Sequence, residues 1–441
     1  MAHDGGNRLE EDLFQGVWMA LHRYAPVLHT TEGKPLVIQG PGVLNRGQGP
    51  DFTDARLTIA GQQWVGNVEM HINESDWFTH GHHQDPRYNS VILHVAVHPG
   101  RPALDSRGRR VPTLLLPHAQ LLVEAYRVLR ASRQEPPCQQ GLALLPPETR
   151  NRWLSKLVVQ RLDAKAEQAL AELSTAPMGW EEAFYRSLAR SLGLHINADP
   201  MLQLARSTPL KALMKVRDHL ESLEAILLGQ AGLLSYVPPQ QEPPYAAFLR
   251  QEYAYRAKEF ALAPINANYW QFMRLRPGSY PTLRLAQLAA ILHGTDHLFS
   301  QILRLDTLAD LEKLLRVKAS AHWDTHYNLT GPQGSAKPKY VGKERLLVVM
   351  INSVVPMRFA YARATANDAL RRHTIGLLEQ LPPETNAIVR RYQTPDFKAA
   401  NAMQTQALVE LSQHFCRPHL CHCCPVGLGQ IMRPFATPQP S

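Results

Sequence analysis

The sequence lacks the features that mark membrane and secreted proteins. No apolar stretch approaches the length of a membrane span, and the N-terminal residues Met-Ala-His-Asp-Gly-Gly-Asn-Arg contain no apolar signal core. There are only five cysteines among 441 residues, and four of them fall within 416–424, unlike a secreted disulfide framework. We therefore expect a cytoplasmic protein with reduced thiols and no membrane association.

A dense basic run is also missing, although the chain as a whole is basic. Its 47 Lys and Arg residues outnumber 38 Asp and Glu residues, which gives a net charge of +9. A basic balance favours polyanions, nucleic acid first, but charge spread over this length also fits an ordinary basic surface. Nucleic acid is the partner that we expect.

The hydrophobic periodicity changes near His118. Residues 8–22 have helical spacing, whereas 54–60, 63–72, 90–97 and 111–116 have the patterns of strands. Helical patterns then dominate at 119–132, 148–173, 180–193, 245–261, 281–293, 346–361 and 402–415. The predicted fold is α+β, with an α/β-type N-terminal core around a mixed sheet and a mostly helical remainder. With a proline-rich linker at 237–244, the predicted domains are 1–118, 119–237 and 245–441.

Acids and histidines crowd into residues 49–98. Asp51 precedes one predicted strand, and Glu69 and His71 leave the same face of the next, opposite the apolar face that Trp64, Val68, Met70 and Ile72 should form. If the two strands pair, Asp51 can meet Glu69. Two converging carboxylates make a hard oxygen site for Mg²⁺ or Mn²⁺, and His71 could orient or deprotonate a water molecule.

This arrangement resembles the PD-(D/E)xK nuclease superfamily, whose pattern is Pro-Asp, a hairpin, and Asp/Glu-x-Lys on the following strand. Pro50-Asp51 and Glu69-Met70-His71 occupy those positions, and the acid of the family's first helix falls on Glu11, or less closely on Glu10. The resemblance implies a nuclease core in which Asp51, Glu69, His71 and Glu11 are catalytic. The sequence departs from the family at His71, which replaces the lysine and loses its permanent charge.

The histidines permit a second interpretation. His71, His80, His82, His83, Asp85 and His94 could supply a zinc, manganese or iron site, and His80, His82 and Asp85 are the candidate ligands of this alternative site. A histidine-site metal hydrolase of a small substrate is then expected. The structural alternative is a group of solvated loop histidines, with His94 as a hydrogen-bonded core residue.

Cys416, Cys421 and Cys424 have the spacing C-x₄-C-x₂-C, which lets thiolates converge on one metal centre, either zinc or an iron–sulfur cluster. The fourth ligand could be Cys138, Cys423, His419 or His422. Some nucleases with the PD-(D/E)xK core carry a cysteine-bound iron–sulfur cluster that joins distant parts of the chain, and that analogy points to Cys138. Free thiols near the C-terminus are the alternative.

Two basic segments are candidate nucleic-acid contacts. Arg274 and Arg276 lie near Trp270, Phe272 and Tyr280 in the sequence. Arginines together with aromatic residues can bind phosphate and stack on bases. Lys337, Lys339 and Lys343 lie in a Gly/Pro-containing loop. In both places, ordinary surface residues are the alternative.

Nearly the whole chain resembles an uncharacterised bacterial family, domain of unknown function 2851. The resemblance implies no activity. Its carriers are Gly49-Pro-Asp-Phe, Gly66-Asn-Val-Glu-Met-His, Ser75-Asp-Trp, Val91-Ile-Leu-His-Val, Arg274-Leu-Arg-Pro, Asn352-Ser-Val-Val-Pro and the Cys416–Cys424 group.

The residue chemistry predicts a metal-dependent, nuclease-like phosphodiesterase acting on nucleic acid. Besides the histidine-site hydrolase, the alternative is a non-catalytic nucleic-acid-binding or scaffold protein with a degenerate nuclease core.

Overall fold

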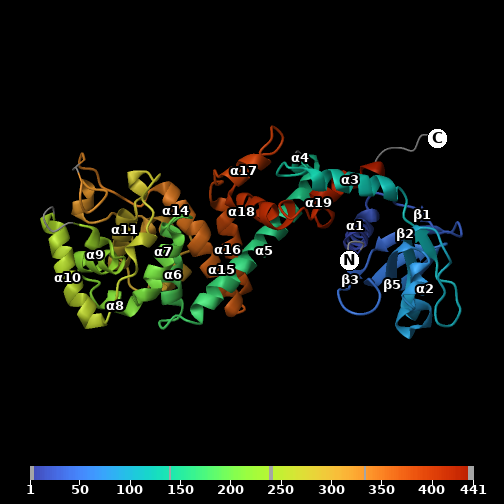
Figure 1. Cartoon of the computed structure of the whole chain (residues 1–441), viewed down its shortest axis with the longest axis horizontal. Helices are drawn as coiled ribbons and strands as arrows, with labels where there is room; N and C mark the ends of the chain where they lie inside the picture. Colours follow the sequence, from blue (N-terminus) through green and yellow to red (C-terminus); the bar gives the residue numbers. More distant parts are fainter. Residues whose placement is uncertain (1–3, 139–140, 238–241, 332–333, 436–441) are drawn as a thin grey trace. The chain divides into compact units, whose positions relative to one another are not determined.

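The computed structural model describes residues 4–138, 141–237, 242–331 and 334–435, and the chain forms two compact units (Figure 1). Unit 1 comprises Met1–Leu157, Thr385–Lys398 and Ala407–Ser441, and unit 2 comprises Val158–Glu384 and Ala399–Gln406. The three consecutive domains expected from the sequence divide the chain at other places, and the expected linker at 237–244 lies partly outside the described residues. The predicted α+β class is confirmed.

Unit 1 is built on a mixed sheet with the strand order β1-β2-β4-β5-β6-β7, in which β3 also pairs with β4. Pairs from β1 to β5 are antiparallel, whereas β5-β6 and β6-β7 are parallel. Strand β6, which lies between β5 and β7, is mostly buried, as its apolar sequence predicts. The strands are β1 (Leu28–His29), β2 (Pro35–Gly40), β3 (Val43–Leu44), β4 (Phe52–Ile59), β5 (Gln62–Asn73), β6 (Val91–His98) and β7 (Thr113–Leu115).

A two-residue turn and a register shift together set the pairing of β4 with β5 at the candidate site. Ala60 and Gly61 both have positive φ, 51° and 81°, as a type I′ hairpin turn requires. The turn pairs Ala55 with Gly66, and an irregularity between Phe52 and Ala55 shifts the register by one residue, so that Phe52 pairs with Val68. Asp51 is therefore placed next to Glu69.

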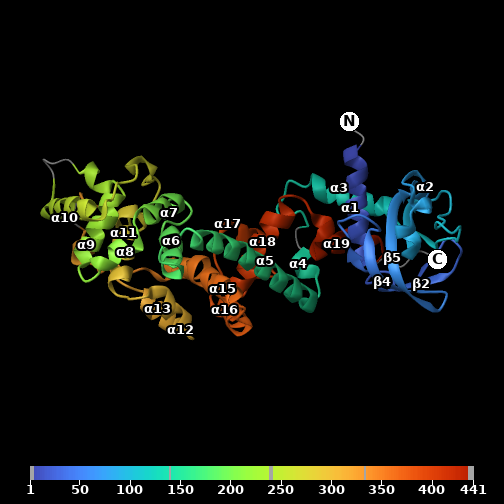
Figure 2. The same cartoon turned by 90° about the horizontal axis from the view of Figure 1, so that it is seen from below.

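Helix α1 (Asp4–Leu21) covers one face of the sheet (Figure 2). Its predicted apolar stripe, which includes Leu13 and Trp18, is fully buried with Val68 and Leu93 of the sheet. Trp64, expected to face this core, is instead 42 % exposed, because the first half of β5 extends beyond the covering helix. On the other face, Trp77 anchors a smaller apolar cluster.

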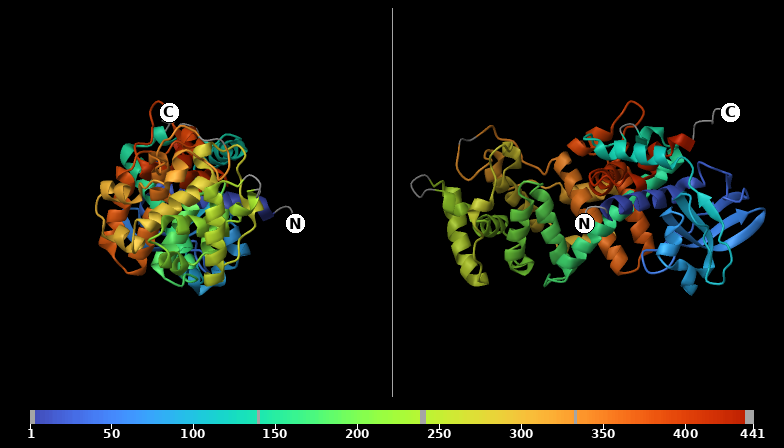
Figure 3. Two further views of the ribbon diagram at one scale, coloured as in Figure 1. Left: turned by 90° about the vertical axis from the view of Figure 1, so that its left-hand side faces the viewer. Right: turned by 45° about the vertical axis from the view of Figure 1, so that its right-hand side comes forward.

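The C-terminal residues complete unit 1. Ile431 and Met432 are fully buried in the same core as α1, and the right-hand view of Figure 3 shows the red C-terminal helices beside the teal α3. Gly16 of α1 packs so closely on residue 422 that a Cβ there would lie 2.4 Å from the carbonyl oxygen of His422. Besides α1, the helices that lie wholly in unit 1 are α2 (Asp76–Thr79), α3 (Ala119–Ala131), α4 (Gly141–Leu144), α17 (Ala387–Tyr392) and α19 (Pro425–Ile431).

Unit 2 is helical throughout its regular structure. Helices α5 (Pro147–Leu173) and α18 (Ala402–Leu411) contain residues of both units. Those wholly in unit 2 are α6 (Trp180–Leu192), α7 (Ala198–Ser207), α8 (Leu210–Lys215), α9 (Leu220–Gln230), α10 (Pro244–Phe260), α11 (Pro281–His293), α12 (Leu298–Arg304), α13 (Leu308–Leu315), α14 (Lys343–Val349), α15 (Val355–Ala364) and α16 (Asp368–Gln380).

One helical run in unit 2 corrects an expectation from the sequence. Lys343–Ala364 is long and apolar enough to cross a membrane by length and composition, although no such stretch was expected. Its most apolar window is 72 % buried inside the protein, as is typical of a core helix. The run is therefore weak support for a membrane span.

Candidate functional site

The predicted carboxylate pair does converge, because β4 and β5 pair in the register described above. The backbone N–H of Asp51 donates to Oε2 of Glu69 at 3.0 Å, and the backbone N–H of Met70 donates to Oδ2 of Asp51 at 3.0 Å. Gln15 of α1 donates to the other oxygen of Asp51 at 3.1 Å. Asn45 holds the preceding turn, since its side-chain amide donates to the carbonyl of Pro50 at 3.0 Å. Each acid is thus fixed by hydrogen bonds before any ligand binds.

These carboxylates are crowded and poorly solvated. Burial raises the pKa of Asp51 to about 7, and repulsion from Glu69 and Glu11 adds to the rise. Burial also raises the pKa of Glu69 to about 8, with a further contribution from Glu11 and an opposing one from the backbone N–H of Asp51. The influence of Glu11 on both pKa values means that the exposed acid on α1 lies close enough to act on the pair, as its predicted supporting role requires.

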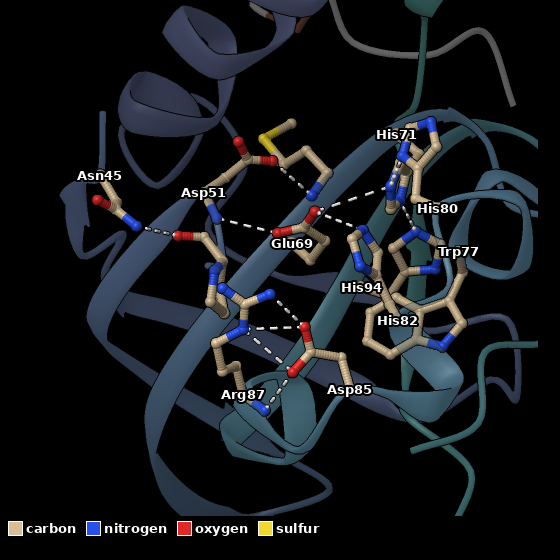
Figure 4. Close-up of polar contacts among 12 residues, drawn as sticks. Asn45, Asp51, Glu69, His71, Trp77, His80, His82, Asp85, Arg87 and His94 are labelled. Atoms are coloured by element: carbon tan, nitrogen blue, oxygen red, sulfur yellow. Dashed lines mark hydrogen bonds and ion pairs between the residues drawn. The ribbon is translucent and has the colours of Figure 1, made fainter. Parts of the chain in front are cut away.

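Histidines line the other side of Glu69. Its Oε1 lies 3.2 Å from Nε2 of His82 and 3.7 Å from Nε2 of His71. His94 is paired with Glu69 across the parallel β5-β6 ladder. Figure 4 shows Glu69 between Asp51 and this histidine group. Glu69 therefore belongs to both the carboxylate pair and the histidine group.

Within the histidine group, the rings form a chain. Nδ1 of His71 lies 2.9 Å from Nε2 of His94, and Nε2 of His71 lies 3.1 Å from Nδ1 of the exposed His80. Burial, followed by the neighbouring histidines, holds the pKa of His71 far below 6.5, and burial lowers the pKa of His94 to about 4. Both rings are therefore neutral at pH 7, which is the form that binds metals.

His71, His80 and His82 place their candidate ligand atoms within 4.8 Å of one another. Asp85, expected with His80 and His82, is not in this set (Figure 4). Its carboxylate is held instead by Arg87, two residues away, with Nη2 of Arg87 donating to Oδ2 at 2.6 Å. The local ion pair removes Asp85 from the predicted set, and His71 takes its place.

Two contributors to the site were not singled out in the sequence. Tyr88 stacks on His82 with ring centroids 3.8 Å apart, and Gln15 binds Asp51. Gln15 lies four residues after Glu11 on α1, so helical spacing could have indicated it. Tyr88 follows a proline in an irregular segment, where no periodicity points to it. Trp77 packs against the histidine group, with its ring centroid 5.2 Å from that of His94 on β6.

The cysteines form a separate group in unit 1. Cys138 lies before α4, Cys416 ends the π-helical turn Ser412–Cys416, Cys421 begins a 3-10 turn, and Cys424 precedes α19. Burial raises the pKa of each thiol, to about 12 for Cys138 and about 11 for Cys416 and Cys421. Repulsion between the thiols adds to the rise in pKa for Cys138, Cys416 and Cys424. Cys138 packs against the apolar core that contains Cys421.

Two of the other candidates for a fourth ligand, Cys423 and His422, are directed elsewhere. Cys423 is exposed, and its charged neighbours are Asp12 and Arg46. His422 is engaged by Tyr126, whose hydroxyl lies 2.7 Å from Nδ1 of the ring. The backbone N–H of His419 donates to the carbonyl of Cys416 at 3.1 Å, and Nδ1 of its ring is buried without a hydrogen-bond partner among the described residues, so His419 stays a candidate beside Cys138. Cys138 packs against the same apolar core as Cys421.

The predicted nucleic-acid contacts all lie in unit 2. Arg274, Arg276, Lys337 and Lys343 are exposed. Lys339 is partly buried, and its ammonium group donates to the carbonyl of Asp324 at 2.8 Å and lies 4.3 Å from the ring centroid of Tyr327. Lys339 therefore contributes to the packing of its own loop.

Comparison with known proteins gives a family but no activity. A family model described as "Protein of unknown function (DUF2851)" matches residues 11–387, so the chain belongs to this family. No curated protein and no solved structure matches the chain. The matched span contains both acids, the histidine group and Cys138, and it ends before Cys416.

Proposed function

We propose that this member of the DUF2851 family is a metal-dependent, nuclease-like phosphodiesterase whose active site is built on Asp51 and Glu69. The observation that carries the proposal is the convergence of the half-buried Asp51, just before β4, with the buried Glu69 of β5, which the hydrogen bonds of the two segments hold side by side. The sequence resemblance to the PD-(D/E)xK superfamily, in which these positions are catalytic, agrees with it.

The donor set suits a hard divalent cation. Asp51 and Glu69 supply oxygen ligands, and their mutual repulsion is the kind of strain that a bound cation relieves. Glu11, on the exposed side of the pair, would support the ion or its water. When bound, Mg²⁺ or Mn²⁺ would polarise the phosphate and lower the pKa of a coordinated water.

The histidines would prepare the attacking water. Because its low pKa keeps His71 neutral, this ring would orient the water more readily than it would hold the proton. Nε2 of His71 would bond to the water in exchange for its contact with His80, since Nδ1 faces His94. The new P–O bond forms to the water oxygen while the bond to the leaving oxygen breaks. His80, the exposed end of the chain of rings, would pass the released proton to solvent, and solvent would protonate the leaving oxygen.

Nucleic acid is the proposed substrate because the chain is basic. The net charge is +9, and Arg274, Arg276, Lys337 and Lys343 present exposed cations. Phosphate contacts of this kind supply affinity that falls steeply with salt. The partly buried Lys339 is a weaker candidate for such a contact.

The test is cleavage of labelled single- and double-stranded DNA and RNA with Mn²⁺ or Mg²⁺. Glu69→Gln keeps the side-chain shape but removes the charge, so we expect a loss of roughly 100-fold or more in rate. Asp54→Asn is the matched control, because Asp54 is an exposed acid on the neighbouring strand β4 and asparagine tolerates its positive φ of 57°. Equal cleavage by wild type and Glu69→Gln would contradict the proposal. If wild type binds nucleic acid in a salt-sensitive way but never cleaves it, the non-catalytic alternative is correct.

A second candidate function is favoured by the compact histidine set. His71, His80 and His82 could hold a transition metal in a hydrolase acting on a small substrate, with Glu69 beside them. A bound transition metal that is lost in His82→Ala and retained in Asp51→Asn, together with hydrolysis of small esters but not of nucleic acid, would favour this candidate over the first.

A further inference from the structure

Four cysteines of unit 1 come from segments far apart in the sequence: Cys138 is half-buried, and Cys416, Cys421 and Cys424 are buried. Cys138 is separated from Cys421 by more than half the chain, yet it packs against the apolar core that contains Cys421. Cys421 acts on both Cys138 and Cys416, and Cys138 and Cys416 act on Cys424. Buried thiols seldom gather in this way without a shared ligand, because free Cys residues pack singly as small apolar groups.

Glycines make room around this group. A Cβ at Gly141 would lie 3.2 Å from Sγ of Cys138 and 2.5 Å from Val426, and a Cβ at Gly427 would lie 2.8 Å from Cβ of Cys421. Neither glycine has positive φ, so the backbone conformation does not require glycine at these positions. The close approach of neighbouring atoms, which leaves no room for a side chain, is the reason for glycine there. The backbone of Val426 and Gly427 also donates hydrogen bonds that favour the thiolate of Cys424.

The spacing of the sulfurs distinguishes between metal centres. A tetrahedral zinc ion with Zn–S bonds of about 2.3 Å brings its sulfur ligands to within about 4 Å of one another. Among the described residues, the histidine set is the group of three or more candidate ligands whose atoms all lie within 4.8 Å, and no three of these cysteines meet that limit. A cluster of several irons holds its cysteine ligands farther apart than one zinc ion does.

We propose that Cys138, Cys416, Cys421 and Cys424 bind an iron–sulfur cluster that fastens the C-terminal segment to the turn before α4. The four thiolates supply the ligands that such clusters require. Cys423, exposed and facing other charged groups, is not a ligand.

The cluster would also support the carboxylate site. Residue 422, between two of the ligands, packs on Gly16 of α1, and the same helix carries Glu11 and Gln15. Loss of the cluster should therefore loosen the helix that holds Asp51. This consequence does not depend on the proposed activity, because the cluster is measured by its metal content.

The experiment is anaerobic purification of the full chain, with iron, zinc and acid-labile sulfide analysis and a visible absorption spectrum. We expect iron and sulfide in comparable amounts and a broad visible absorption. Cys424→Ser and Cys138→Ser should lose most of the iron, whereas Cys423→Ser should retain it. Since the ligand variants could fail to fold, the metal content of wild type is decisive by itself.

A colourless wild-type protein with one zinc per chain, or one without metal, would overturn the proposal. Loss of iron in Cys423→Ser equal to that in Cys424→Ser would overturn the ligand assignment. Either a two-iron or a four-iron cluster would support it, and the ratio of iron to protein distinguishes them. A protein with the cluster but without nuclease activity would leave this inference intact and reject the proposed function.

Discussion

At the scale of single residues, local chemistry made part of the site predictable. Strand alternation and a two-residue turn made the pairing of β4 with β5 predictable, whereas the register shift between Phe52 and Ala55, which brings Asp51 next to Glu69, has no periodic signal. Asp85 could not be excluded in advance, since its ion pair with Arg87 depends on the turn that brings the two together. The fourth cysteine could be nominated only by analogy, because no local rule connects residue 138 with residue 416.

A buried carboxylate in unit 2 gives a prediction on pH dependence. Glu224 is fully buried and accepts hydrogen bonds from the hydroxyl of Ser320 at 2.9 Å and from Tyr245. Burial raises the pKa of Glu224 from 4.5 to about 7. A raised carboxyl pKa favours folding below the unfolded pKa, and this contribution is lost as the pH rises through the folded pKa. At about 1.4 kcal/mol per pKa unit, roughly 3 kcal/mol is lost between pH 4.5 and pH 8.

Glu224→Gln removes the charge and keeps a group that can bond to both hydroxyls. We expect a variant that is similar to wild type near pH 4.5 and more stable than wild type at pH 8, by up to about 3 kcal/mol in the free energy of unfolding. Urea unfolding at several pH values measures this difference. Glu221→Gln, an exposed acid on the same helix, should leave the pH dependence as it is. If Glu224→Gln changed the free energy of unfolding by the same amount at pH 4.5 and at pH 8, Glu224 would not be the source of this pH dependence.

At the scale of elements, the sequence predicted where helices and strands form better than it predicted what packs against them. The stripe of α1 was predictable because its apolar residues repeat every three or four positions. The exposure of Trp64 was not, because alternation indicates which face a residue lies on but not where the covering helix ends. The π-helical turns Met350–Val354 and Ser412–Cys416 also lack a periodic signal.

The close contact of α1 with the cysteine segment yields a prediction for a matched pair of glycines. Gly16→Ala gains helix propensity but places a methyl group against the carbonyl of His422, so we expect a net loss of about 1–3 kcal/mol in stability. Gly376→Ala in α16 makes the same change with no atom within 4 Å, and should stabilise by about 0.5–1 kcal/mol. Thermal unfolding of both variants is the measurement. If Gly16→Ala stabilises the protein, the segment around His422 moves away from the added methyl group without loss of stability, and the prediction is wrong.

At the scale of the whole molecule, the sequence was least informative. Unit 1 is assembled from three separate stretches, with most of unit 2 inserted between the first and second of them. Periodicity and composition describe neighbours along the chain, and they contain no signal that residues 407–435 return to the N-terminal sheet. A division of the chain into consecutive domains, based on periodicity and composition, could therefore not predict that unit 1 is assembled from separate stretches.

Burial of the returning segment predicts that its core residues stabilise unit 1. Ile431 is fully buried with the residues of α1, so Ile431→Ala should cost about 2–5 kcal/mol of unfolding free energy. Val128→Ala on α3, where the side chain is 66 % exposed, should change stability by no more than about 0.5 kcal/mol. Chemical unfolding followed by limited proteolysis measures both and shows which unit opens. If Ile431→Ala and Val128→Ala lost the same free energy of unfolding, burial of the returning segment would not stabilise unit 1.

The inserted arrangement has a consequence for the order of events during synthesis. Ribosomes make the N-terminal end first, and domains generally fold as their residues emerge. The sheet of unit 1 thus emerges early, but α19 and three of the four clustered cysteines follow only after all of unit 2 has been translated. For most of that time the nascent chain must carry a unit 1 whose core, although covered by α1, still lacks Ile431 and Met432. Chaperones that shield such an incomplete core, and the timing of cluster delivery, would then decide how much of the protein matures.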